Sequence, residues 1–107
     1  MGYSIIGDAL AELTNECFHY QAPNKTEPSY IVWSEDSSLD LEADNIHAEK
    51  AMQGTADLFT NDEDDELIEQ IPEKFEEIGA SYYKNSTQVE PETGLIHHEW
   101  VWSLCQR

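Results

Sequence analysis

The last part of the chain alternates apolar and polar side chains, and this alternation constrains the fold more than any other local pattern. Side chains of a β-strand point alternately to its two faces. In an extended segment over residues 95–105, one face would carry Ile96, His98, Trp100, Trp102 and Leu104. The opposite face would carry His97, Glu99, Val101 and Ser103. Two indoles two positions apart predict that the first face packs into the core.

A second extended segment, residues 80–89, precedes this strand. The two segments are joined by Pro91-Glu92-Thr93-Gly94, which suits a type I turn with Gly94 in the left-handed conformation. We therefore expect an antiparallel hairpin at the end of the chain.

Three further elements are predicted before the hairpin. Residues 3–15 carry apolar side chains at helical spacing, namely Ile5, Ile6, Ala9, Leu10 and Leu13. Residues 30–34 are β-branched or aromatic and predict a buried strand. Residues 51–59 predict a second strand, in which Gly54 indicates a bulge or a close approach of another backbone.

A second helix is predicted after Thr60, which forms a capping box with Glu63. Its buried stripe would be Leu67, Ile68, Ile71, Phe75 and Ile78. Gly79 is a natural residue to end the helix, whereas Pro72 should kink it, at a cost of about 3 kcal/mol unless packing compensates.

The polar segment between the first two predicted strands, residues 34–50, has no clear period. We expect it to be a mobile loop that becomes ordered only against a partner. The order helix, two strands, helix and hairpin predicts one α+β domain over residues 1–107. Two helices would pack on an antiparallel, or mixed, sheet of four to five strands.

The formal charge of −18 arises from 23 Asp and Glu residues against five Lys and Arg residues. Such a surface repels the phosphates of nucleic acids, which argues against direct DNA or RNA binding. The charge leaves three interpretations: solubility, a partner with a basic face, or a negatively charged surface along which DNA moves without being bound. No apolar run is long enough to span a membrane and no secretory signal is visible, so we expect a soluble protein kept in a cytoplasm.

Residues that suggest chemistry are few. In a reducing cytosol, Cys17 and Cys105 are expected to be small buried apolar residues. A disulfide or a metal pair is the alternative, although two cysteines alone are too few for a zinc site. In His97-His98-Glu99 only His97 and Glu99 share a strand face, so a third metal ligand would have to come from elsewhere. The acidic run after Thr60 lacks the glycine of a calcium loop. We therefore predict no catalytic residue, no metal and no cofactor, and a protein that is not an enzyme.

Several segments spread over nearly the whole chain carry a family resemblance. They are Leu10-Ala11-Glu12-Leu13, Pro28-Ser29-Tyr30-Ile31-Val32-Trp33, Ala43-Asp44-Asn45, Ala56-Asp57-Leu58-Phe59-Thr60, Ile78-Gly79 and Glu92-Thr93-Gly94-Leu95-Ile96-His97-His98 running into Trp100-Val101-Trp102. In these segments the chain resembles the small tail-completion proteins of long-tailed phages, also called tail terminators or head–tail joining proteins. The resemblance is one of elements and loose positions.

The resemblance implies a small α/β fold that assembles into a ring, commonly a hexamer, at the head-proximal end of the tail tube. Such a ring stops tube polymerisation and offers a surface to the head connector, first in the host cytoplasm and then in the virion. It has no enzymatic activity and no cofactor, and DNA would pass its lumen without being bound. The candidate partner interface consists of Trp33, Asp36, Asp40, Leu41, Glu42 and Asp44.

Two other functions remain open at this point. An acidic DNA mimic would capture a basic nucleic-acid enzyme through carboxylates spaced like phosphates. A small α+β ligand-binding domain would require a deep apolar pocket with convergent polar groups.

Overall fold

The computed structural model describes residues 4–39 and 50–106, which form a five-stranded sheet and two helices. The elements are α1 (Ser4–Ala11), β1 (Cys17–His19), β2 (Tyr30–Leu39), β3 (Lys50–Thr60), α2 (Leu67–Ile78), β4 (Ser81–Val89) and β5 (Ile96–Gln106). The strands lie in the order β1-β2-β3-β5-β4, with β1 parallel to β2 and every other pair antiparallel. The predicted α+β class and mixed sheet are confirmed, but the predicted element order lacked β1.

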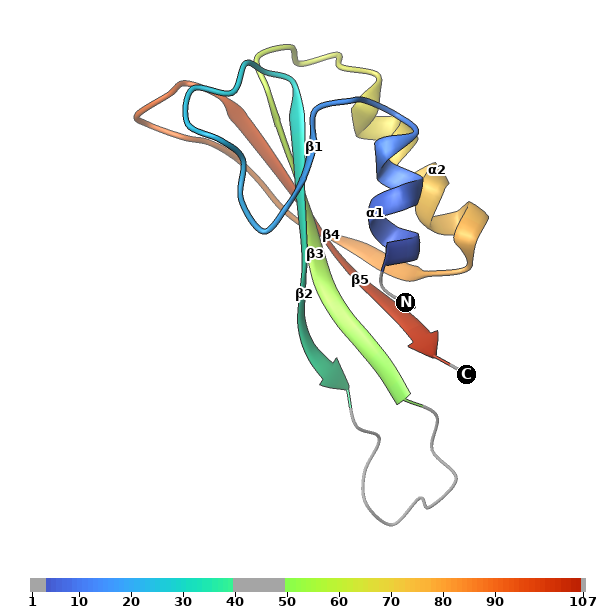
Figure 1. Cartoon of the computed structure of the whole chain (residues 1–107). Coiled ribbons are helices and arrows are strands. Elements are labelled where there is room, and N and C mark those ends of the chain that lie inside the picture. Colours follow the sequence, from blue (N-terminus) through green and yellow to red (C-terminus); the bar gives the residue numbers. More distant parts are fainter. Residues whose placement is uncertain (1–3, 40–49, 107) are drawn as a thin grey trace.

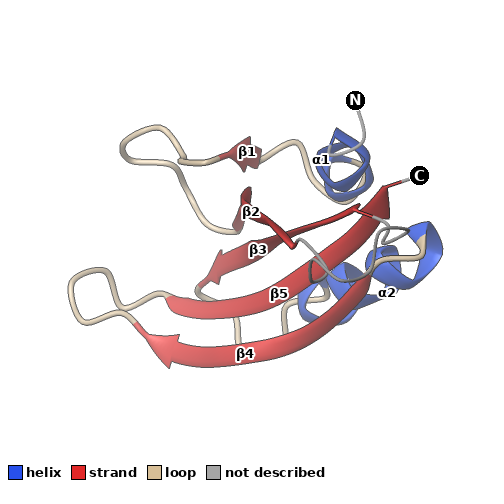
Figure 2. Cartoon of the chain, turned by 90° about the horizontal axis from the view of Figure 1, so that it is seen from below, coloured by secondary structure: helices blue, strands red, loops and turns tan. Residues whose placement is uncertain are grey.

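Both helices lie on the same face of the sheet (Figure 1). The turn between β4 and β5 and the loop between β1 and β2 reach toward the opposite side, as the view along the sheet also shows (Figure 2). The core fills the space between helices and sheet. Its largest fully buried side chains are those of Trp102, Phe75, Ile6, Leu10, Ile31, Leu58, Ile71 and Thr60.

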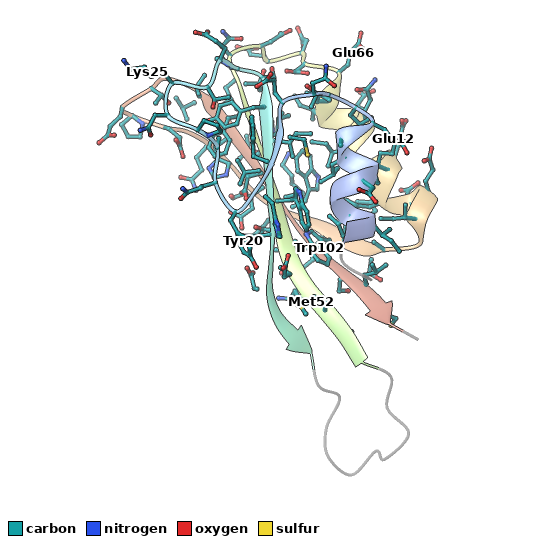
Figure 3. All side chains as sticks on the ribbon, viewed as in Figure 1. Glu12, Tyr20, Lys25, Met52, Glu66 and Trp102 are labelled. Carbon is teal, nitrogen blue, oxygen red and sulfur yellow. The ribbon has the colours of Figure 1, made fainter. Side chains whose placement is uncertain are left out.

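The C-terminal hairpin forms as the alternation predicts. Trp100 and Trp102 are 2% and 0% exposed, and both belong to the core cluster. The Trp102 indole projects from the sheet toward the helices (Figure 3), and its Nε1 donates a hydrogen bond of 2.9 Å to the Thr55 carbonyl. Gly94 has φ 74°, as expected for the left-handed position of the turn.

The β2–β3 pair is longer than predicted. β2 continues to Leu39, so residues 34–39, which we expected to be part of a loop, form a strand. The pairing slips by one residue between Glu35 and Ser37, opposite Gly54. A Cβ at Gly54 would overlap the Ser34 carbonyl oxygen, which confirms the predicted close approach. Residues 40–49, the rest of the predicted mobile loop, lie outside the described residues.

Helix α2 begins later than the predicted capping box required. Its first residue is Leu67, so the acidic residues that follow Thr60 precede the helix, and the Thr60/Glu63 prediction is wrong. Thr60 is fully buried and donates instead to Asp65 Oδ2 (2.6 Å), while Asp65 Oδ1 accepts from the Leu67 backbone N–H (2.9 Å). The predicted end is confirmed, because Gly79 has φ 78° and follows the helix directly. Pro72 lies inside the helix.

The two cysteines have different surroundings, and both are free thiols. Cys17 is partly buried, and burial raises the pKa of its thiol to about 11. Cys105 is exposed, so the prediction that both are buried is wrong for that residue. Among the described residues, neither helix is long and apolar enough to cross a membrane.

Candidate functional site

In the described part of the chain, a cleft of about 550 Å³ lies on the sheet face that carries no helix. Its floor is formed by side chains of β2, β3 and β5. One wall is the loop after β1, residues 20–26, and Thr93 and Leu95 contribute from the β4–β5 turn. Three segments that are distant in sequence therefore enclose it.

An aromatic row forms part of the cleft floor. The strand registers place Tyr30 beside Phe59 and Phe59 beside His97. The Tyr30 and Phe59 rings stack at a centroid distance of 4.9 Å, and Phe59 stacks on the His97 ring at 4.3 Å. This row gives the cleft flat apolar surface, the usual lining of ligand sites.

A group of carboxylates surrounds His97 next to this row. Asp57 of β3 pairs directly with Glu99 of β5, and His97 lies two positions before Glu99 on the same face. His97 Nε2 is 2.7 Å from Asp57 Oδ1, and His97 Nδ1 is 3.1 Å from Glu90 Oε2. Asp57 Oδ2 also accepts a hydrogen bond of 3.2 Å from the Thr55 hydroxyl.

These neighbours favour the charged form of the His97 ring. The hydrogen bond with Asp57 raises the pKa of His97 most strongly, Glu90 adds to the effect, and partial burial opposes it. Among the described residues, both hydrogen-bond partners of His97 are carboxylates. The ring therefore has no nucleophile to activate, and the arrangement suits charge pairing or cation binding better than acid–base catalysis.

The neighbouring His98 belongs to the core face instead. It is 7% exposed, and its Nδ1 lies 3.0 Å from Lys84 Nζ. Burial lowers the pKa of His98, and the adjacent Lys84 lowers it further. The pKa values of the two consecutive histidines are thus shifted in opposite directions, because the alternation along β5 places the two rings on opposite faces of the sheet.

The sheet also has two open edges of different kinds. Within the described residues, no strand pairs with the outer edge of β4. On the other side, β1 pairs only with Ile31, Val32 and Trp33, so no strand within residues 4–39 and 50–106 pairs with the outer edge of β2 from Ser34 onward. Tyr83 on β4 is 58% exposed. Open edges expose unpaired N–H and C=O groups to another chain.

The predicted interface residues are only partly described by the structure. The Trp33 indole packs in the core, where it is 8% exposed and stacks on His19 at 3.9 Å. Asp36 is exposed at the irregularity in β2, next to the open edge. Asp40, Leu41, Glu42 and Asp44 lie outside the described residues.

Sequence reasoning identified His97 and Glu99 but missed Asp57 and Glu90. The alternation of β3 placed Asp57 on the polar face, opposite Ala56 and Leu58, and this was the only available signal. It does not specify which residue of β5 lies beside Asp57, because that depends on the pairing register of two distant strands.

The comparisons with known proteins assign no family to the chain. It matches no protein-family model, and a search of curated proteins finds no similar sequence.

Proposed function

We propose that this chain is a structural protein that assembles head to tail with copies of itself into a ring, and that it completes the tail of a long-tailed phage. In this function the ring ends the tail tube and offers a surface to the head connector. The observation that carries the proposal is the pair of unlike open edges on β4 and β2. The resemblance in sequence gives the assembly its phage context.

Head-to-tail assembly follows from the difference between the two edges. If the β4 edge of one copy meets the β2 edge of the next, the first copy still has a free β2 edge and the second a free β4 edge. Such a heterologous contact repeats from copy to copy and produces a ring when the rotation between successive copies closes, and an open filament when it does not. The C-terminal end of β2 and the N-terminal end of β3 extend beyond both helices (Figure 1). A neighbouring copy could reach these ends without meeting the helix layer.

The charge of the chain supports a role beside DNA without binding to it. With −18 on each copy, a ring wall would repel the phosphates of DNA passing through the lumen. The same charge opposes assembly at low ionic strength. The Debye length falls from about 30 Å at 0.01 M salt to about 8 Å at 0.15 M, so salt removes most of the repulsion between copies.

Light scattering coupled to size-exclusion chromatography tests this proposal. We expect a monomer in dilute low-salt buffer and a ring, six copies in the family pattern, as salt and protein concentration rise. Tyr83→Asp places a charge at the β4 edge and should prevent assembly. Asn61→Asp adds the same charge at an exposed position before α2 and should not.

Two outcomes would contradict the proposal. A strict monomer at high salt and high concentration would exclude a self-assembling ring. A dimer that forms equally well with Tyr83→Asp would show that the β4 edge is not used. Capture of a basic enzyme by a DNA mimic should instead weaken as salt rises, so the same salt series separates that alternative.

The cleft favours a second candidate, a small ligand-binding domain. Its volume of about 550 Å³ lies in the range of small-molecule sites, and its floor combines stacked aromatic rings with convergent polar groups. Fluorescence-detected screening of aromatic and cationic small molecules tests this candidate. Binding that Phe59→Ala abolishes would support it.

A further inference from the structure

We propose that Asp57, His97 and Glu99 bind one divalent transition-metal ion, with Zn²⁺ the preferred probe. The ligand atoms of these three residues lie within 4.8 Å of one another on the helix-free face of β3 and β5. This site does not depend on ring assembly, and the aromatic row of the cleft floor adjoins it.

The distances require only small movements to admit an ion. His97 Nε2 and Asp57 Oδ1 are now 2.7 Å apart. Two ligands at about 2.0–2.2 Å from a tetrahedral ion are separated by about 3.4 Å. The pair therefore opens by less than about 1 Å. A ligand atom of Glu99 already lies within 4.8 Å of both.

A second shell is already present around these ligands. Glu90 Oε2 lies 3.1 Å from His97 Nδ1 and can accept a hydrogen bond from the Nδ1–H group, which leaves the Nε2 lone pair on the Asp57 side of the ring for a metal ion. Metal-binding histidines almost always donate the other ring N–H to a carboxylate, a backbone carbonyl or water. The Thr55 hydroxyl, which donates to Asp57 Oδ2, holds the aspartate in the same way.

The donor set decides which metal the site would take. One imidazole nitrogen with two carboxylate oxygens suits Zn²⁺ and its neighbours, whereas Ca²⁺ and Mg²⁺ prefer oxygen ligands alone. Three protein ligands leave one coordination position open for water or a small anion, because structural zinc sites use four. His97 and Asp57 both line the cleft, so a ligand in the cleft could reach that position.

The competing explanation is that His97 is only a charged ring paired with carboxylates. Isothermal titration of the chelator-treated full chain with Zn²⁺, in millimolar Ca²⁺ to occupy unspecific carboxylates, distinguishes the two. We expect one Zn²⁺ per chain, with affinity reduced more than about 100-fold in His97→Gln and about 10–100-fold in Glu90→Gln, as for loss of an outer-shell partner. Co²⁺ in place of Zn²⁺ should give the visible absorption of a four- or five-coordinate site.

Two control variants test whether loss of any exposed carboxylate, or of any imidazole next to a carboxylate, weakens Zn²⁺ binding. His19→Gln removes another imidazole beside a carboxylate, since His19 Nε2 lies 2.8 Å from Glu35 Oε1. Glu73→Gln removes one exposed carboxylate of α2. Both should bind Zn²⁺ like the unaltered chain, whereas Glu99→Gln should bind it much more weakly.

The proposal is overturned if His97→Gln or Glu99→Gln binds Zn²⁺ with unchanged affinity. It is also overturned if several ions bind and Ca²⁺ displaces them. Circular dichroism checks that each variant is folded. Glu99→Gln leaves the His97–Asp57 pair in place, so it decides the question even if the His97 variant unfolds.

Discussion

Replacing Asp65 by alanine should destabilise the protein well beyond the usual effect of a surface substitution. This carboxylate joins three parts of the chain: it accepts hydrogen bonds from the Ser29 hydroxyl, from the Thr60 hydroxyl at 2.6 Å and from the Leu67 N–H at 2.9 Å. It therefore satisfies the backbone N–H of the first residue of α2 and also the hydroxyl of a fully buried residue.

The magnitude follows from these contacts. Loss of a side-chain acceptor for a backbone N–H at a helix start, as in capping, costs about 0.5–2 kcal/mol. A buried hydroxyl without its acceptor costs about 1–3 kcal/mol, although Thr60 can still accept from Ser29 at 2.9 Å. We expect a total loss of about 2–4 kcal/mol for Asp65→Ala. Asp65→Asn should lose less, because an amide oxygen can still accept from Leu67.

The effect should depend on pH with a defined sign. Burial opposes ionisation of Asp65, but the hydrogen bonds from Ser29, Thr60 and Leu67 outweigh it and lower its pKa below the ordinary 3.8. A group with a lowered pKa in the folded state contributes stability above its unfolded pKa and loses it as pH falls through the folded value. The difference between the unaltered chain and Asp65→Ala should thus be constant at neutral pH and shrink below about pH 4.

Urea denaturation followed by tryptophan fluorescence measures this free energy of unfolding. Asp64→Ala is the matched control, since it removes the same charge from an exposed neighbour and should change stability by less than about 0.5 kcal/mol. If Asp65→Ala and Asp64→Ala denature at the same urea concentration, the carboxylate does not stabilise the start of α2 as described.

Three further changes test other parts of the fold. Trp102→Ala should cost about 3–5 kcal/mol of unfolding free energy, because removal of a fully buried indole leaves a cavity and the Thr55 carbonyl loses its donor. An unchanged urea midpoint would show that the two faces of β5 are assigned the wrong way round. Gly54→Ala should cost about 1–3 kcal/mol, since its Cβ would overlap the Ser34 carbonyl and lie 2.5 Å from Trp102 Cζ2; a stabilised variant would contradict this packing. The urea midpoint of the unaltered chain should rise between about 0.05 M and 1 M NaCl, because salt screens a charge of −18; a falling midpoint would show that attractive ion pairs dominate instead.

Patterns that are local in the chain were sufficient to predict most of the elements. In β5 the alternation identified the buried indoles, because a strand has only two faces and an apolar face must be covered. Gly79 and Gly94 were predicted from turn chemistry, since a positive φ is strained for residues with a Cβ. These features depend on neighbours within a few residues, and the sequence contains that information directly.

Other elements depended on partners that local patterns do not reveal. The three residues of β1 are too few to show a period, and they become a strand because β2 supplies their hydrogen bonds. Five of the six residues 34–39 are polar, yet β2 continues through them because β3 pairs with this segment. The capping-box prediction failed because Thr60, at the end of β3, is held inside the core by Asp65 rather than starting a helix.

The candidate site, too, has one part that local patterns predict and another that depends on distant partners. The alternation of β3 and β5 by itself determined that Asp57, His97 and Glu99 lie on polar strand faces. Only the tertiary structure decided that these faces are adjacent and in register, with Asp57 opposite Glu99 and within hydrogen-bond distance of His97. The reason is physical: strand alternation is a property of one backbone, whereas the register between strands is chosen by the packing of Trp100, Trp102 and Leu58 on the other face of the sheet.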